Sequence, residues 1–469
     1  MIAKSLAIKV LNAALSTGGD YAEIFVEETR SSSVLLENGK VEAVGGPLSY
    51  GAGIRILKGF ESVYGYTSDL SAKSLTNLAA QLAGSYEGKR QIEVTSIARQ
   101  KIKKINKVTK PVIDVPIEER IDYLKKCHEA TAAVDARLVR IVDALSAARK
   151  SIQIFTAEGS EGKEFRKIEE KARLTMTAMA SSEDGQIETA YKGPGRFDGW
   201  DYFTNVLDYL GKSKEIGEKA IMMLTAKECP SGEYTVVISN GWGGVLFHEA
   251  CGHPLEADAT SKGLSCFAGK IGEQIASPLV SAYDDGTIPN EWGSSDIDDE
   301  GIPTKKNMLI KDGICVGYMV DKSHGRRLGM EPNGSSRRQS YRYCPTSRMS
   351  NTYIAAGKDD PADIIKDTKL GIYVADFGGG SVDPTTGEFN FSASEAYIIR
   401  DGKIAEPVKG CTLIGKGNEV LLNIDRVGND LQLGQGYCGA ASGSIPVNVG
   451  QPTIRISKIT VGGRGGKLE

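Results

Sequence analysis

The sequence predicts an α+β protein made of two parts. The N-terminal domain, residues 1–225, is expected to combine an antiparallel sheet with helices, because strand-like and helix-like segments alternate along it. The C-terminal domain, residues 226–469, is expected to be a twisted, largely antiparallel β domain, because glycine becomes frequent and helical patterns thin out beyond residues 227–233 (KECPSGE). A chain of 469 residues has room for two or three domains at about 100–200 residues each.

Individual elements follow from local patterns. A two-residue Asn38-Gly39 turn between SVLLE and KVEAV predicts a β-hairpin, since both residues tolerate positive φ. Ser71 is a plausible N-cap for a helix over residues 71–83. The other expected helices and strands are an amphipathic N-terminal helix (Leu6, Val10, Leu11 and Ala14 on one face), helices over 118–134 and 216–224, and strands over 21–26, 33–37, 51–57, 62–66, 139–156, 167–180 and 234–239.

Composition narrows the class of protein. Hydrophobic residues make up 40% of the chain and charged residues 25%, which is typical of a globular protein. The formal net charge of -3 gives no reason to expect direct nucleic-acid binding. Lys9 interrupts the only apolar run that could form a signal-peptide core, and there is no run of 18 apolar residues, so we expect no membrane association. Eight irregularly spaced cysteines indicate reduced thiols and a cytoplasmic location.

The segment His248-Glu249-Ala250-Cys251-Gly252-His253 is the strongest candidate for a metal site. It resembles the zincin motif H-E-x-x-H, in which two histidines bind zinc and the glutamate is the general base, but the spacing is one residue longer. On a regular helix, residues i and i+5 lie about 140° apart, so the two imidazoles would diverge. They can converge if the helix bulges or ends between them, and Gly252 and Pro254 favour such a departure.

Zinc needs a third protein ligand and an open position. Cys251, Glu256 and Asp258 are the nearby candidates, and Cys438 is a distant one. Cys438 lies in Gly-Gln-Gly-Tyr-Cys-Gly, which matches G-x-G-x-x-G, but no helix pattern follows, so a glycine-rich turn presenting a thiolate is a better interpretation than a dinucleotide loop.

Beyond this segment, several further stretches occur in a fixed order. They are HEACGHPLEAD, DDEG at 298–301, RRQSY at 337–341, RMSNTY at 348–353, FGGG at 377–380, FSASEAY at 391–397, KGCTLIG at 409–415, GND at 428–430 and VGQPT at 449–453. Together they resemble the TldD/PmbA family, also known as modulators of DNA gyrase, over most of residues 230–465 and more loosely in the N-terminal half.

The resemblance implies a TldD-type zinc metallopeptidase subunit, because PmbA-like (TldE) members lack the histidine motif. It implies that His248, His253 and Cys438 bind Zn²⁺ and that Glu249 is the general base. It also implies that the substrates are unfolded or flexible polypeptides and that the subunit pairs either with itself or with a TldE/PmbA-like partner.

Two other functions remain possible from the sequence. One is a non-catalytic interaction subunit that modulates a gyrase or toxin–antitoxin system, although a structural metal site would not need Glu249. The other is a cysteine peptidase that uses Cys438 with His324 or His253. The oxyanion donor of a peptidase is likewise open, with His324, Tyr341 and Arg338 as candidates.

A basic stretch interleaved with tyrosines is a candidate binding surface. It contains Arg337, Arg338, Arg342 and Arg348. Since the chain as a whole is slightly acidic, we interpret this stretch as a site for a peptide carboxylate or a subunit contact rather than for nucleic acid.

Overall fold

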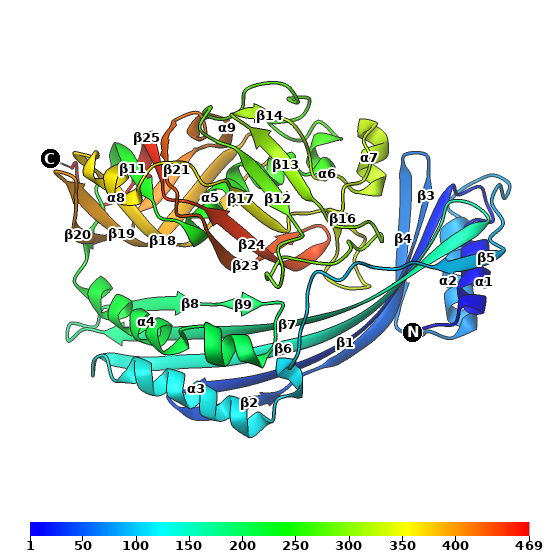
Figure 1. The fold of residues 1–469 in the computed structure, drawn as a ribbon, viewed down its shortest axis with the longest axis horizontal. Coiled ribbons are helices and arrows are strands. Elements are labelled where there is room, and N and C mark those ends of the chain that lie inside the picture. The colour runs from blue at the N-terminus through cyan, green and yellow to red at the C-terminus, as the bar shows by residue number, and fades with distance from the viewer. Residues whose placement is uncertain (469) are drawn as a thin grey trace.

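The computed structural model describes residues 1–468. The C-terminal half of the chain lies over the concave side of a long, curved sheet formed by the N-terminal half (Figure 1). Within the described residues, no helix is both long and apolar enough to cross a membrane.

Two neighbouring antiparallel strands are the longest in the N-terminal sheet. These are β6 (Leu138–Ala157) and β7 (Glu161–Ser181). The main path of the sheet runs β4-β3-β1-β6-β7-β5, with β2 beside β1 and with β8 and β9 beside β7. The remaining bounds are β1 (Tyr21–Glu37), β2 (Lys40–Gly45), β3 (Leu48–Lys58), β4 (Glu61–Thr67), β5 (Ser96–Arg99), β8 (Ile187–Lys192) and β9 (Gly195–Arg196).

Pairs of helices cover the two ends of this sheet. Near one end, α1 (Lys4–Ala14) and α2 (Ala72–Ala83) form a core with β1 and β3. Toward the other end, α3 (Ile117–Ala132) and α4 (Tyr209–Leu224) pack on β6 and β7 (Figure 1). The predicted cap of α2 is present, because the Ser71 side chain accepts a hydrogen bond from the N–H of Ser74 at 3.2 Å.

The Asn38-Gly39 hairpin is also present, with Asn38 at φ 47° and Gly39 at φ 75°. The prediction of separate strands over 21–26 and 33–37 was wrong, because both belong to the continuous strand β1. The intervening polar residues still pair with β6 along their whole length. The backbone pairing of β1 with β6 therefore continues through a segment that has no alternation of apolar and polar residues.

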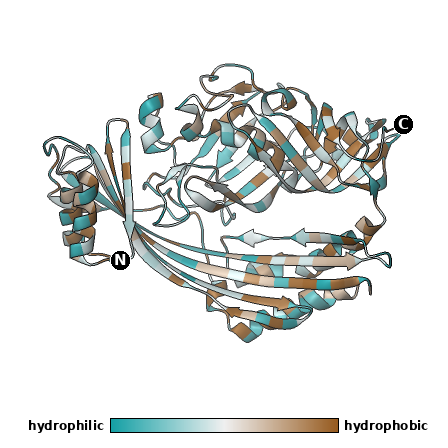
Figure 2. Ribbon diagram, turned by 180° about the vertical axis from the view of Figure 1, so that it is seen from behind, coloured by the Kyte–Doolittle hydropathy of each residue, from teal (hydrophilic) through white to brown (hydrophobic). Residues whose placement is uncertain are grey.

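Among the described residues, the C-terminal half contains two larger sheets and a two-stranded sheet of β15 and β16. The first has the order β10-β20-β19-β18-β11-β25-β21, with β22 beside β25. The second has the order β14-β13-β12-β17-β24-β23. Pairing is largely antiparallel, as predicted, but β10–β20, β11–β18 and β17–β24 are parallel. Polar and apolar residues alternate along many strands, as expected where one face of a sheet is buried (Figure 2).

The strand bounds in this half are β10 (Lys227–Glu228), β11 (Gly232–Ile238), β12 (Ala282–Asp285), β13 (Lys306–Lys311), β14 (Ile314–Cys315), β15 (Ser336–Arg337), β16 (Thr346–Ser347), β17 (Asn351–Ile354), β18 (Leu370–Val382), β19 (Glu388–Arg400), β20 (Lys403–Lys409), β21 (Thr412–Lys416), β22 (Ile424–Val427), β23 (Gln432–Ala440), β24 (Gly443–Gln451) and β25 (Ile454–Gly462). The short helices are α5 (Val245–Phe247), α6 (Ala257–Thr260), α7 (Lys322–Leu328), α8 (Pro361–Lys366) and α9 (Gly417–Val420). We propose that the change of architecture after α4 is the boundary between a domain of residues 1–225 and a domain of residues 226–469.

Buried ion pairs join the two halves. Arg55 on β3 pairs with Glu23 on β1 and with Glu300 from the C-terminal half, and all three side chains are fully buried. Arg338 makes a second buried bond to Glu23, at 2.5 Å. Because removing one partner of a buried pair leaves an uncompensated charge, these bonds make the relative position of the halves specific.

Candidate metal centre

The histidine segment lies in the core between the two C-terminal sheets. After β11, a single turn of 3₁₀ helix (Gly241–Gly244) leads into α5, and α5 leads into the π-helical turn η4 (His248–Gly252). Leu246 and Ala250 are fully buried in this core. The segment is therefore held by packing on both sides before any metal binds.

The π-helical turn resolves the problem of the i,i+5 spacing. The N–H of His253 bonds to the carbonyl of His248, so these two residues bracket one complete turn and lie on the same side of the helix. Their rings are 5.2 Å apart, nearly perpendicular. A Cβ on Gly252 would lie 2.2 Å from the Met349 Sδ, so glycine at this position lets Met349 pack directly against the turn.

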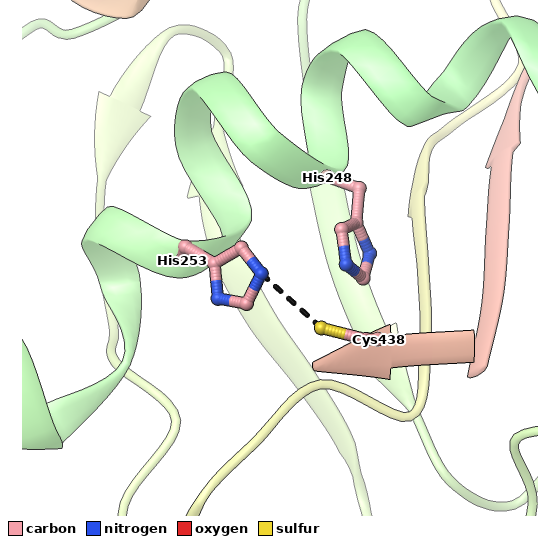
Figure 3. A group of neighbouring side chains, drawn as sticks. All are labelled: His248, His253 and Cys438. Carbon is pink, nitrogen blue, oxygen red and sulfur yellow. Dashed lines mark hydrogen bonds between the residues drawn. The ribbon is translucent and has the colours of Figure 1, made fainter. Parts of the chain in front are cut away.

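Cys438 reaches this turn from β23, 185 positions later in the chain. Its Sγ lies 3.2 Å from the Nε2 of His253. One ligand atom from each of His248, His253 and Cys438 lies within 4.8 Å of the others (Figure 3). The strand thus points its thiol at the two imidazoles.

The charges in this cluster favour a thiolate. Burial would raise the pKa of Cys438, but His248 and His253 lower it to about 3. Burial would lower the pKa of His253, but Glu256 and then Cys438 raise it well above its usual value. The cluster therefore has the anionic sulfur donor that zinc prefers.

Glu256 and Arg348 contact the His-His-Cys cluster from outside it. The Oε2 of Glu256 lies 3.0 Å from the Nδ1 of His253, which leaves Nε2 facing the thiol. Arg348 is fully buried and donates to the carbonyl of Cys438 at 2.6 Å, while its Nε lies 3.8 Å from the Oε1 of Glu256. A carboxylate on the outer ring nitrogen is the usual means of orienting a metal-binding histidine.

Glu249 lies beside the His-His-Cys cluster and makes no hydrogen bond to it among the described residues. Its Oε2 is 3.7 Å from the Nε2 of His253, and 23% of its side chain is exposed. Such a carboxylate can reach both the cluster and a substrate in solvent, which is what a general base requires.

The other candidates named from the sequence are engaged elsewhere. Cys251 is fully buried among apolar groups, and burial raises the pKa of its thiol. Asp258 bonds to the Nε2 of His324 at 3.1 Å, and the Nδ1 of His324 bonds to Asp321 at 2.7 Å. Tyr341 and Arg338 lie in the contact between the two halves. None of these groups belongs to the His-His-Cys cluster among the described residues.

Sequence reasoning missed what Glu256 and Arg348 do. Glu256 was considered only as a ligand, although its position three residues after His253 is also the spacing of a helical side-chain pair. Nothing in the sequence could indicate that Arg348 joins the strand of Cys438 to Glu256, because that contact spans about ninety residues in both directions.

The cluster has the donors that a zinc ion needs. Imidazole nitrogen and thiolate sulfur are ligand types that zinc prefers, and catalytic zinc sites use three protein ligands. The Nδ1 of His248 is buried and has no hydrogen-bond partner among the described residues. Buried polar atoms normally have a partner, so the ring of His248 suits a metal-binding role.

Comparisons with known proteins agree over the length of the chain. Three family models match: PmbA/TldA metallopeptidase domain 1 over residues 22–85, the central domain over 110–224 and the C-terminal domain over 231–463. A Haemophilus influenzae protein named metalloprotease TldD homolog is 39% identical, covering 95% of this chain and 93% of its own length. A Methanothermobacter thermautotrophicus metalloprotease is 34% identical, covering 95% of this chain and 96% of its own length.

Solved structures share the fold. TldE of Thermococcus kodakarensis superposes with a TM-score of 0.72 at 19% identity, covering 94% of this chain and 97% of its own. A Thermotoga maritima protein whose proposed role is modulation of DNA gyrase superposes with a TM-score of 0.76 at 21% identity, covering 94% of this chain and 96% of its own. At such identities, the likeness concerns the fold alone.

Proposed function

Since the chain belongs to the PmbA/TldD metallopeptidase family, we propose that it is a zinc-dependent peptidase that hydrolyses unfolded or flexible polypeptides. The observation that carries the proposal is the convergence of His248, His253 and Cys438, with Glu249 beside them. A Saccharolobus solfataricus relative, 28% identical over 263 residues, is named a zinc metalloprotease TldD homolog, which supports zinc as the metal.

In this proposal His248, His253 and Cys438 hold the ion, and Glu256 and Arg348 fix the orientation of the ligands. A zinc ion at this position would lower the pKa of a coordinated water toward 7 and polarise the scissile carbonyl. Glu249 takes the proton of the attacking water and delivers it to the leaving amine. Its partial exposure lets it reach a substrate.

We propose that the subunit is cytoplasmic and acts as a dimer, with a second copy or with a TldE/PmbA-like subunit. The existence of a TldE protein with the same fold supports the second arrangement. Size measurement of the chain alone, and of the chain co-expressed with such a subunit, distinguishes the two.

A cysteine peptidase is the second candidate, because the 3.2 Å contact between Cys438 and His253 also resembles a thiolate–imidazolium pair. Against it, Cys438 is only 5% exposed, so its sulfur is poorly placed to attack a polypeptide. A non-catalytic gyrase or toxin–antitoxin modulator is a third candidate, which Glu249 does not favour.

The test compares the native chain with Glu249→Ala and, as a control, Glu273→Ala, whose side chain is 56% exposed on the surface. We measure bound zinc by atomic absorption and cleavage of a denatured protein. We expect Glu249→Ala to keep about one zinc per chain and lose cleavage by a factor of about 10² or more. A variant that keeps zinc and cleaves like the native chain refutes the mechanism, and cleavage that survives a chelator supports the cysteine peptidase instead.

A further inference from the structure

A pocket separate from the metal cluster lies between the two halves of the chain. Its volume is about 390 Å³, which is within the usual range for small-molecule sites. Strands β1, β6 and β7 form one side, and loops of the C-terminal half together with β23 and β24 form the other. Figure 1 shows β23 and β24 facing these long strands. None of His248, Glu249, His253 and Cys438 lines the pocket.

The lining combines apolar surface with a concentration of cations. Trp292, Tyr437, Ile152, Ile445 and Pro446 provide the apolar part. The cations are Lys150, Lys167, Lys171, Arg337 and Arg338, against the carboxyl groups of Glu169, Asp298 and Asp299. Lys167, Glu169 and Lys171 alternate along β7, so all three side chains leave the same face of the strand.

Most of these charges are already satisfied. Lys167 is bonded to Asp299 and to Glu169, each at 3.0 Å. Arg338 pairs with Glu23, and Lys150 donates to the carbonyl of Gln339 at 2.7 Å and lies 3.6 Å from Glu27. Asp298 accepts three backbone N–H bonds, which engage both of its carboxyl oxygens.

Two cations have no hydrogen bond to a carboxylate among the described residues: Lys171, which is buried, and Arg337, which is partly buried. Among the described residues, the Arg337 guanidinium donates to the backbone carbonyls of Met349 and Pro446, at 2.5 and 2.7 Å, and to no carboxylate. Lys171 is 8% exposed, its nearest carboxylate oxygen, on Glu169, is 4.0 Å away, and no hydrogen bond from its Nζ occurs within residues 1–468. Lys171 and Arg337 therefore keep N–H donors that an added anion can use.

The electrostatics agree with the geometry. Burial lowers the pKa of Lys171 to about 7 in spite of Glu169, and Arg337 contributes to the lowering by repulsion. Burial also lowers the pKa of Arg337. The two cations thus repel each other, while Glu169 attracts both of them.

We propose that this pocket binds a small organic anion, whose charged group lies between Lys171 and Arg337 and whose apolar part packs against Trp292 and Tyr437. The proposal is independent of zinc and of the peptidase reaction. The site shares β23 with the metal cluster, because Tyr437 precedes Cys438 and Trp292 donates to the carbonyl of Gly436 at 2.8 Å. A bound anion therefore touches the strand that carries the thiol.

Calorimetric titration of the full chain with three matched probes tests the proposal. The probes are N-acetylphenylalanine, its uncharged amide and phenyl phosphate. We expect at least one acid to bind the native chain about tenfold or more tightly than the amide, since charge-assisted hydrogen bonds are the strong ones. The tighter acid identifies the headgroup as a carboxylate or a phosphate.

Three variants locate the binding. Lys171→Met should weaken binding of the acid probe about tenfold or more, whereas Lys171→Arg should preserve its affinity. Lys125→Met changes a half-exposed lysine on α3 outside the pocket and should leave the affinity unchanged. An anion held by the metal centre would bind native and Lys171→Met chains equally. Either that result or equal binding of acid and amide overturns the proposal.

If Lys171→Met does not fold, the native chain still decides the question. Lys171 should react with an amine-acylating reagent more slowly when the acid probe is present, and the amide should give no protection. Mass spectrometry of the labelled peptide measures both rates. Equal protection by acid and amide, or none by either, contradicts the proposal.

Discussion

The substitution Glu256→Gln tests whether a carboxylate behind His253 sets the strength of metal binding. Glu256 is 6% exposed, and its Oε2 lies 3.0 Å from the Nδ1 of His253, whereas its Oε1 accepts the N–H of Met349 at 3.2 Å. Glutamine can still accept the N–H of Met349, but it cannot place a negative charge beside His253. Partners of this kind typically contribute about 10–100-fold to metal affinity, which corresponds to about 1.4–2.7 kcal/mol.

The assay is competition for zinc with a chromophoric chelator. We expect a dissociation constant about 10–100-fold higher for Glu256→Gln than for the native chain, with little change for the exposed control Glu273→Gln. An affinity within about threefold of native would refute the orienting role of Glu256. Complete loss of zinc would instead make Glu256 a ligand, which was one of the possibilities from the sequence.

Three further outcomes are expected. A Cβ on Gly417 would lie 2.1 Å from the carbonyl oxygen of Ala250 in the π-helical turn, so Gly417→Ala should destabilise the chain by about 1–3 kcal/mol in denaturant titrations, whereas Gly439→Ala, with open space around it, should not. Burial lowers the pKa of His324, but Asp258 and Asp321 raise it to about 9, above its usual 6.5. The stabilisation by protonated His324 is therefore complete below about pH 6.5 and lost as the pH rises through 9, so the melting-temperature difference between native and His324→Gln should shrink over that interval, and a constant difference would contradict this. Removal of metal with a chelator should lower the melting temperature. Zinc at about 1,000 times its dissociation constant should restore about 4 kcal/mol of unfolding free energy. No recovery with zinc would exclude coupling of the site to folding.

Local chemistry made much of the fold predictable. The Asn38-Gly39 hairpin, the Ser71 cap and the α2 helix depend on neighbouring residues and appear as expected. Strand β1 was predicted in two pieces, because its polar middle carries no apolar alternation. That middle is held by the ladder with β6, more than a hundred residues away, which no local pattern records.

For the candidate site, the sequence supplied the candidate donors and the tertiary structure decided their arrangement. The residue types of His248, Glu249, His253 and Cys438 indicated zinc chemistry, and the resemblance to a family indicated that the four belong together. Only the fold shows a π-helical turn that aligns the two imidazoles and a strand, 185 positions on, that brings the thiol to 3.2 Å from one of them. Both the π-helical turn and the approach of the thiol depend on packing between the sheets. That packing joins residues that are far apart in the chain, so local sequence patterns could not predict either feature.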